Sequence, residues 1–337
     1  ASSPGDAEAV AQVAACINKA EVAALARCIS GDVDAAVRAL ASAKFPVVHV
    51  FLGVSDIHLE RKLGISRARA VRIISESVRR AAAAGVIVEF SPEDATRTDP
   101  IFLRQCIATA IDAGASRINI PDTVGYALPA EYGCLIANVV AFVGREVMVS
   151  THCHDDMGLS TINTITAITA GARQAEVAVN GLGERAGNTS VEEVGVILAM
   201  KKMARTGLYL DRIHRLSEYV AAASGVAVQA NRAIIGENAF SHSSGIHQDG
   251  ILKHPETYEY VPPALVGVPG HRFVLTARSG RKAIAHEMAR MGKIVGAAEM
   301  DRIYTAFLRY AEERRGAVTQ EDLSAIVRGD STLSACS

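Results

Sequence analysis

The feature that most constrains the fold of this chain is an alternation of short β-branched runs with longer helical patterns over its first 205 residues. Each run is nearly continuous in apolar residues, which is typical of strands covered on both faces. Strands separated by helices favour a parallel sheet. The expected strands are Glu21–Arg27, Val47–Gly53, Ile87–Ser91, Arg117–Pro121, Val147–His152 and Ala175–Asn180.

Helical periodicity fills the segments around these strands. The expected helices are Asp6–Ala20, Asp32–Lys44, Arg67–Ala84, Pro100–Ala113, Pro129–Val143, Ser160–Ala172 and Val191–Arg205. The first helix has no strand before it, so two strands of an eight-stranded barrel have no counterpart in this sequence. After the alternation stops, Leu208–Gly225 and Ala283–Arg315 are expected to be helices around a stretch rich in Gly, His and Ser.

Polar residues gather directly after four successive expected strands, which is where a TIM barrel carries its chemistry. A doubly wound sheet would instead concentrate its ligands at one switch point. The four segments are Ser91–Asp94, Pro121–Gly125, His152–Asp156 and Asn180–Asn188. We therefore predict an α/β fold: a TIM (β/α)8-type barrel with about six βα units in residues 1–205. A mostly helical C-terminal appendage in residues 206–337 is predicted to contribute to the active site.

Composition excludes several classes of function. The 35 Lys and Arg residues against 36 Asp and Glu give a net charge of -1, which leaves no basic surface for nucleic acid. No apolar run approaches the roughly 18 residues that span a bilayer, so we expect no membrane segment. The six cysteines lack CxxC spacing and are expected to be reduced thiols of an intracellular protein.

His152 and His154 form the first candidate site. One residue separates them at the end of an expected strand, so both imidazoles point to the same face. Two such imidazoles can hold one divalent metal, although a pair of this kind more commonly forms hydrogen bonds within a core. Asp155, Asp156 and Asn188 favour the metal, and a shell of imidazole and oxygen ligands suits Mn²⁺, Mg²⁺ or Zn²⁺.

Three further residues are candidates for proton transfer. Glu93 follows Ser91 and Pro92 at a strand end, where it could act as an acid or base, or simply begin a helix. His247 and Tyr258 lie outside the barrel, and each taken alone is more commonly structural. The glycine-rich run before Asn188 lacks the spacing and the lysine of phosphate-binding loops, so nucleoside triphosphate binding is excluded.

Taken together, four segments resemble the 2-isopropylmalate synthase family, within the pyruvate carboxylase-like TIM-barrel metalloenzymes. They are Asn119–Gly125, Ser150–Leu159, Asn180–Asn188 and His242–Gly250. The resemblance spans essentially the whole chain. The barrel motifs are shared with homocitrate and citramalate synthases, whereas Ser244–Gly250 and Ala277–Arg281 are closer to the isopropylmalate branch. Ser55–Glu60, Val88–Asp94 and Ser150–Cys153 resemble the plant members, which work in plastids.

This resemblance implies a Claisen-type acyl transfer that joins acetyl-CoA to 3-methyl-2-oxobutanoate, followed by thioester hydrolysis to 2-isopropylmalate in leucine biosynthesis. Related methylthioalkylmalate, citramalate and homocitrate synthases are the alternatives, and pocket width decides among them. The resemblance also implies a divalent metal, a homodimer or homotetramer, and a location in the plastid stroma for a plant protein or otherwise in the cytoplasm.

The resemblance also implies roles for individual residues. Three match the metal ligands: His152, His154 and Asn188. Three match positions for acid and base steps: Glu93, His247 and Tyr258. Three match the lining of the 2-oxo acid pocket: His49, Ser91 and Thr123.

Two family features have no counterpart in this sequence. One is an Arg-Asp motif on the first barrel strand, whose Asp is a further metal ligand and whose Arg stabilises the enolate oxygen. The other is a C-terminal leucine-sensing domain. Because losing one electrostatic donor typically costs about 10²–10³ in rate, the alternative is a catalytically impaired paralogue acting as a binding or regulatory subunit.

Overall fold

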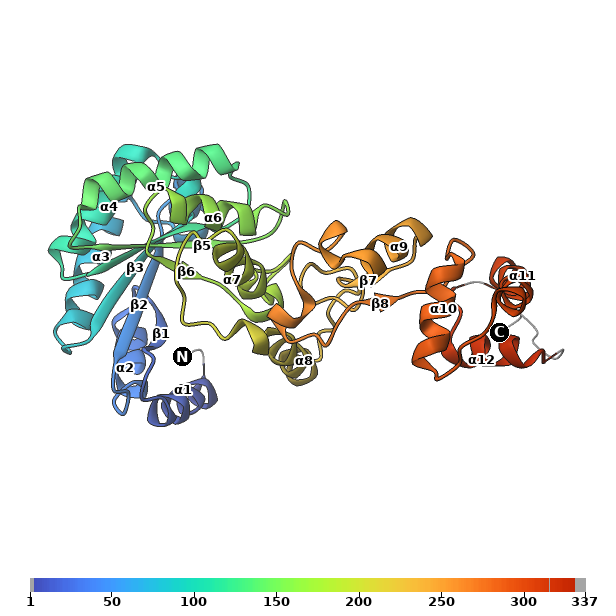
Figure 1. Cartoon of the computed structure of the whole chain (residues 1–337). Coiled ribbons are helices and arrows are strands. Elements are labelled where there is room, and N and C mark those ends of the chain that lie inside the picture. Colours follow the sequence, from blue (N-terminus) through green and yellow to red (C-terminus); the bar gives the residue numbers. More distant parts are fainter. Residues whose placement is uncertain (1–2, 315, 331–337) are drawn as a thin grey trace. The chain divides into compact units, whose positions relative to one another are not determined.

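The computed structural model describes residues 3–314 and 316–330. The chain divides into two compact units between Val194 and Gly195, and each unit is described by itself. The first holds the sheet, and the second is mostly helical (Figure 1). The predicted domain boundary between residues 205 and 206 stays a prediction.

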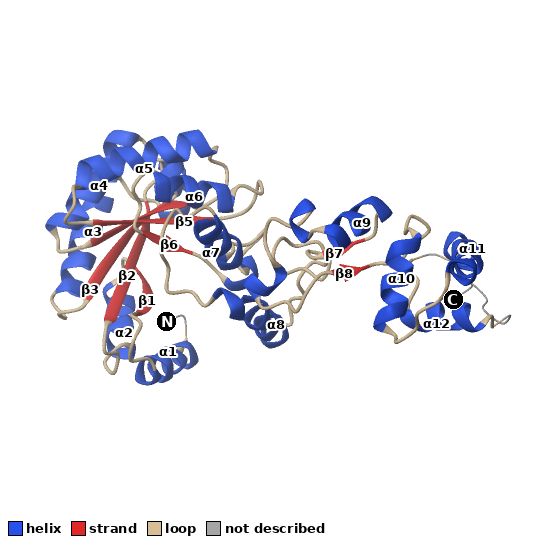
Figure 2. Cartoon of the chain, viewed as in Figure 1, coloured by secondary structure: helices blue, strands red, loops and turns tan. Residues whose placement is uncertain are grey.

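A parallel sheet of six strands forms the centre of the first unit, with each strand beside the next in chain order (Figure 2). The strands are β1 (Val22–Arg27), β2 (Pro46–Gly53), β3 (Ile87–Glu93), β4 (Arg117–Asp122), β5 (Met148–Cys153) and β6 (Gln174–Glu176). This sequential order is that of a TIM barrel, because a doubly wound sheet reverses its order at a switch point. The predicted barrel fold with six βα units is confirmed.

The helices of the first unit supply the apolar cover of one face of the sheet. They are α1 (Pro4–Cys16), α2 (Ser30–Ala39), α3 (Arg67–Ala82), α4 (Pro100–Asp112), α5 (Pro129–Val143), α6 (Ser160–Thr169) and the start of α7 (Val191–Met200). On β2, Val48, Val50 and Leu52 belong to the hydrophobic core, whereas His49 and Phe51 alternate with them. Alternate residues of a strand face opposite sides, so His49 and Phe51 face the barrel interior.

The interior face of the sheet is polar along its middle strands. By the same alternation it receives Glu89 on β3, Asn119 on β4, His152 on β5 and Glu176 on β6. The parallel registers pair His49 with Glu89, and His152 with Glu176. Polar side chains from separate βα units therefore meet inside the barrel.

The sixth strand ends earlier than the sequence predicts. β6 stops at Glu176, and the prediction of a strand to Asn180 is wrong. Residues Val179–Gly181 form a 3₁₀ turn in which Asn180 has a φ of 61°. Asn tolerates this left-handed conformation, and the Asn180 amide N–H donates to the buried carboxylate of Glu192 at 2.9 Å.

Among the residues that the structure describes, the second unit combines five complete α-helices, the C-terminal part of α7 and short 3₁₀ turns with one short pair of parallel strands. The helices are α8 (Ile213–Ser224), α9 (Gly245–Lys253), α10 (Arg281–Arg290), α11 (Ala297–Glu313) and α12 (Gln320–Arg328). The strands are β7 (Ser241–His242) and β8 (Arg272–Phe273). No helix in residues 3–314 and 316–330 combines the length and apolar character needed to cross a bilayer.

Several predicted helix bounds are wrong. α1 ends at Cys16 rather than Ala20, α2 ends at Ala39 rather than Lys44, and α8 begins at Ile213 rather than Leu208. The segment predicted as one helix from Ala283 is two, α10 and α11, because Gly292 adopts a φ of 75° directly after α10. The predicted end of that segment, Arg315, lies outside the described residues. α7 ends at Met200 rather than Arg205, and Lys202 follows with a φ of 54°.

Candidate functional site

A cavity of about 380 Å³ lies along the inner face and C-terminal ends of the strands in the first unit. Its lining includes these predicted site residues: His49, Ser91, Glu93, Thr123, His152 and His154. Four polar residues that the sequence analysis did not assign to the site also line it: Asn119, Glu176, Glu184 and Arg185. The structure therefore brings residues from all six strands, and from the loops that follow β4, β5 and β6, to one place.

The imidazoles of His152 and His154 meet within this cavity. His152 lies at the end of β5, and their Nε2 atoms are 3.1 Å apart with the rings nearly perpendicular, at 86°. Two nitrogen ligands at about 2.1 Å from one metal, at a right angle to each other, lie about 3 Å apart. Burial and the neighbouring His154 lower the pKa of His152 to about 3, which keeps its imidazole in the neutral, metal-ligating form.

Asn188 stands opposite His154, because the two residues form an isolated antiparallel β-bridge. The Asn188 side-chain amide donates to the Leu182 carbonyl at 2.9 Å, so its Oδ1 points the other way. That oxygen is buried and has no hydrogen-bond partner among the described residues. A buried amide oxygen without a partner is a ligand that a divalent cation would satisfy. Two imidazoles and an amide oxygen are a donor set that suits Mn²⁺, Mg²⁺ or Zn²⁺. The imidazoles line the cavity, whereas Asn188 is not among its lining residues and is joined to them through the bridge to His154.

The glycines around Asn188 shape its loop. A Cβ at Gly183 would lie 2.1 Å from Asn188 Nδ2, and a Cβ at Gly187 would lie 2.1 Å from the Gly181 carbonyl oxygen. Gly187 also has a φ of 98°. Only glycine lets the backbone approach this closely. The loop is thus built around the Asn188 side chain.

Glu176 is one of the four lining residues that the sequence analysis did not assign to the site. Its Oε1 lies 3.3 Å from His49 Nδ1, and its Oε2 lies 3.2 Å from His152 Nδ1. Burial and the nearby Glu89 carboxylate raise the pKa of Glu176 to about 8. The imidazoles of His49 and His152 lower the pKa of Glu176 when their N–H groups donate to its carboxylate. An acidic residue inside a predicted apolar strand was the signal that could have revealed it.

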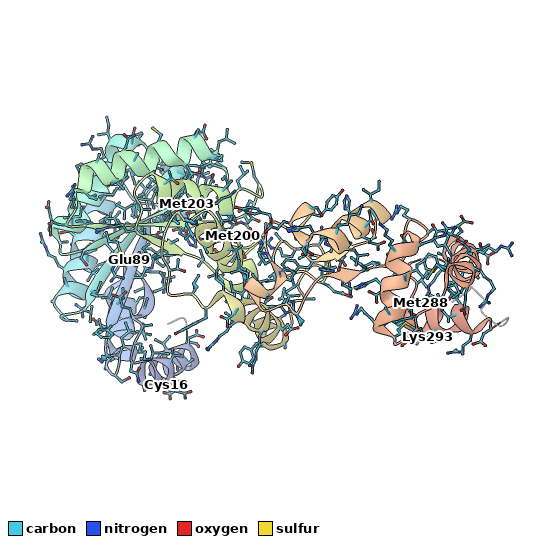
Figure 3. The ribbon with its side chains drawn as sticks, viewed as in Figure 1. Cys16, Glu89, Met200, Met203, Met288 and Lys293 are labelled. Carbon is cyan, nitrogen blue, oxygen red and sulfur yellow. The ribbon has the colours of Figure 1, made fainter. Side chains whose placement is uncertain are left out.

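A second cluster that could hold a metal lies beneath the first. Ligand atoms of His49, Glu89 and Glu176 are all within 4.8 Å of one another. Glu89 lies among the strands and is 2% exposed (Figure 3). Both of its carboxylate oxygens accept from the Gln174 amide, at 2.8 and 3.0 Å. This carboxylate is therefore already satisfied by a protein donor.

His49, Ser91 and Asn119 form a hydrogen-bonded chain across three strands. The Asn119 side-chain amide donates to Ser91 Oγ at 2.7 Å, and Ser91 Oγ lies 2.7 Å from His49 Nε2. Burial lowers the pKa of His49. Beside them, Thr123 Oγ1 accepts from the Asp94 amide at 2.9 Å, and the Thr123 carbonyl accepts from Arg185 at 2.8 Å.

Glu93 is the last residue of β3 and does not begin a helix. Lys62 Nζ contacts both carboxylate oxygens, at 2.8 and 2.9 Å, and His58 Nδ1 lies 3.7 Å from Oε2. Gly53 leaves room for this arrangement, because a Cβ there would lie 2.7 Å from His58 Nδ1 and 3.1 Å from Glu93 Oε2. Asp94 then turns the chain with a φ of 66°.

His247 and Tyr258 belong to the second unit, where the structure stacks them on each other. Their ring centroids are 4.1 Å apart and their planes differ by 29°. Gly250 allows this approach, since a Cβ there would lie 2.5 Å from Tyr258 Cε2. Within the second unit, the two predicted acid–base residues therefore form one pair.

Comparison with known proteins gives the family. Residues 1–220 match the family described as HMGL-like, and residues 234–315 match the homocitrate synthase post-HMGL domain-like family. The chain belongs to the HMGL-like family. A 2-isopropylmalate synthase from Listeria welshimeri is 44% identical over 99% of this chain. One from Shewanella loihica is 45% identical over 97% of it. The chain spans 66% and 63% of the length of these two relatives.

Solved structures show the same fold. The HMG-CoA lyase of Pseudomonas aeruginosa aligns with a TM-score of 0.55 at 23% sequence identity, covering 65% of this chain and 75% of that one. The predicted resemblance is thus confirmed at the level of the family. Both relatives named above are bacterial, and neither supports the predicted plant-like branch or a plastid location.

Proposed function

We propose that this chain carries the catalytic region of an acyltransferase that condenses acetyl-CoA with 3-methyl-2-oxobutanoate to give 2-isopropylmalate, in leucine biosynthesis. The observation that carries the proposal is 44% identity, over 99% of the chain, to a protein named 2-isopropylmalate synthase. The chemistry of the barrel cavity supports it residue by residue.

In this proposal His152, His154 and Asn188 hold a divalent cation, either Mn²⁺, Mg²⁺ or Zn²⁺. The 3.1 Å separation of the two Nε2 atoms and the buried Asn188 Oδ1 without a partner support that assignment. A cation at this place supplies Lewis-acid polarisation of a ketone oxygen.

The 2-oxo acid binds beside this site, against His49, Ser91 and Thr123. The cavity is also lined by Leu25 and Phe51. Apolar walls suit the branched alkyl group of 3-methyl-2-oxobutanoate better than the second carboxylate of 2-oxoglutarate. Arg185 also lines the cavity, but its guanidinium already pairs with the Asp156 carboxylate at 2.7 and 2.9 Å. These contacts support the isopropylmalate branch over the homocitrate branch.

The reaction needs one proton removed from the thioester methyl group, one carbon–carbon bond formed to the ketone carbon, and one water consumed to release CoA. Glu93 is the proposed base within the cavity, and Lys62 Nζ orients its side chain by a contact of 2.8 Å. His247 and Tyr258 are the proposed groups for the remaining acid and base steps.

The test offers the purified chain acetyl-CoA with a panel of 2-oxo acids and follows release of free CoA thiol in the presence of each cation. We expect the fastest release with 3-methyl-2-oxobutanoate. We also expect loss of that release in Glu93→Gln, but not in Glu146→Gln, which alters an exposed carboxylate outside the cavity. A preference for 2-oxoglutarate would assign the chain to homocitrate synthesis. Absence of release with every acid would favour the binding or regulatory subunit.

A further inference from the structure

We propose that Glu176 is a positioning residue that holds a metal-binding imidazole and a pocket imidazole with one carboxylate. The inference rests on the proposed function, because it presumes a cation at His152. The parallel register places Glu176 directly beside His152, and the two carboxylate oxygens divide between two rings. Oε2 lies 3.2 Å from His152 Nδ1, and Oε1 lies 3.3 Å from His49 Nδ1.

The hydrogen bonds of the pocket fit the His49 tautomer that is protonated on Nδ1. Asn119 donates its side-chain amide hydrogen to Ser91 Oγ at 2.7 Å. When the Ser91 hydroxyl donates to His49 Nε2, at 2.7 Å, the imidazole carries its own hydrogen on Nδ1, and that nitrogen lies 3.3 Å from Glu176 Oε1. This is the tautomer that the positioning role requires. One carboxylate oxygen is thus matched to one imidazole N–H.

The geometry of His152 supplies the second match. Its Nε2 faces His154 Nε2 at 3.1 Å, so the nitrogen that would bind the cation is Nε2. A ligating imidazole must then carry its hydrogen on Nδ1. His152 Nδ1 is buried and has no aligned hydrogen-bond partner among the described residues, and Glu176 Oε2 lies 3.2 Å from it. A carboxylate behind a ligating imidazole fixes the tautomer and ring orientation and raises the basicity of the ligand.

The charged groups around Glu176 are consistent with a positioning role for its carboxylate. Among the described residues, its ion pairs involve only the two imidazoles, and no Lys or Arg side chain pairs with it. The neighbouring Glu89 is different, because the Gln174 amide occupies both of its oxygens. A half-buried carboxylate without a fixed cation is costly unless imidazole N–H groups and a nearby metal stabilise its charge.

The experiment measures Co²⁺ binding to the whole chain, by equilibrium dialysis and by the visible absorption of the bound ion. Glu176→Gln keeps the side-chain volume but cannot accept from both imidazoles. We expect its Co²⁺ affinity to fall by about 10–100-fold and its absorption spectrum to shift. The matched control is Glu287→Gln, which removes a buried carboxylate that does not line the cavity. It is expected to keep an affinity close to that of the wild type.

A second measurement separates positioning from folding. Nitrogen-15 chemical shifts of the histidine rings in the metal-free chain should show His152 protonated on Nδ1 in the wild type, and a mixture of tautomers in Glu176→Gln. Unchanged affinity and unchanged shifts in that variant would overturn the positioning role while leaving the metal site standing. Equal losses in Glu176→Gln and Glu287→Gln would also overturn it. A wild-type chain that binds no Co²⁺ would overturn the metal site and the positioning role together.

Discussion

Replacing Gly183 by Ala tests whether the glycine-rich loop exists to aim the Asn188 side chain. The added Cβ would lie 2.1 Å from Asn188 Nδ2, whereas ordinary contact begins near 3.4 Å. The amide must therefore retreat by about 1.3 Å, and a metal ligand tolerates a displacement of about 0.2 Å. We expect Gly183→Ala to lose Asn188 as a ligand, and metal affinity to fall by at least about tenfold.

The same substitution should barely change the stability of the metal-free chain. Gly183 does not have a positive φ, so Ala reduces the freedom of the unfolded chain and stabilises by about 0.4–1 kcal/mol. Rotation of the amide breaks its hydrogen bond to the Leu182 carbonyl, which costs about 0.5–1.5 kcal/mol. Because these terms offset each other, we expect the free energy of unfolding to stay within about 1 kcal/mol of the wild type.

The assay compares Mn²⁺ or Co²⁺ affinity with urea unfolding for Gly183→Ala, Asn188→Ala and the double variant. If Gly183 acts only through Asn188, the double variant binds no more weakly than Asn188→Ala alone. Gly207→Ala is the control, since a Cβ there has no atom within 4 Å. Wild-type metal affinity in Gly183→Ala would refute the reasoning, and so would additive losses in the double variant.

Three further outcomes follow from the structure. Gly53→Ala should displace the carboxylate of Glu93 and lower the rate of CoA release by about 100-fold, because catalytic groups tolerate little displacement. Measuring kcat and thermal unfolding on the same variant will distinguish a displaced carboxylate from a misfolded chain. Burial raises the pKa of the Cys28 thiol to about 12, so alkylation at pH 8, mapped by mass spectrometry, should label exposed Cys16 and spare Cys28 until the chain unfolds. The hydrogen-bonded guanidinium of Arg117, on β4, holds the pKa of Glu21 below its ordinary value of 4.5. The stability that this ion pair adds is present above pH 4.5 and is lost as pH falls through the lowered pKa. In Glu21→Gln, the free energy of unfolding measured in urea should therefore depend less on pH in the acid range.

The sequence predicted those parts of the fold and site that depend on local pattern. Six strand-like runs separated by helical periodicity are enough to predict a parallel sheet, because the continuous apolar residues of each run indicate a strand that is buried on both faces. The period of two likewise predicts that His152 and His154 share a face. Glu176 could not be assigned in this way, because its role comes from the pairing of β5 with β6, and register between strands is a long-range property.

The errors have the same origin. The periodicity of the predicted helix from Ala283 continues across Gly292, so only the left-handed backbone found there reveals the break between α10 and α11. The strand predicted to reach Asn180 ends at Glu176, because Glu192, twelve residues beyond Asn180, captures the Asn180 amide. In each case a long-range contact or a backbone dihedral angle ends an element, although the residue pattern on both sides of that point still predicts a strand or a helix.

The alternation along β3 explains how one strand can serve stability and chemistry together. Glu89, Ser91 and Glu93 face the interior in turn, and residues two apart on a strand are separated by about 6.6 Å. Glu89 is held by a protein amide, Ser91 joins the hydrogen-bonded pocket, and Glu93 reaches the C-terminal end of the strand beside Lys62. Over about 13 Å along β3, the side chains change from the buried, hydrogen-bonded Glu89 to Glu93, which lines the cavity. Along β3, Glu93 at the C-terminal edge is therefore separated from the Glu89 carboxylate that Gln174 holds, and a substitution at Glu89 can leave the position of Glu93 unchanged.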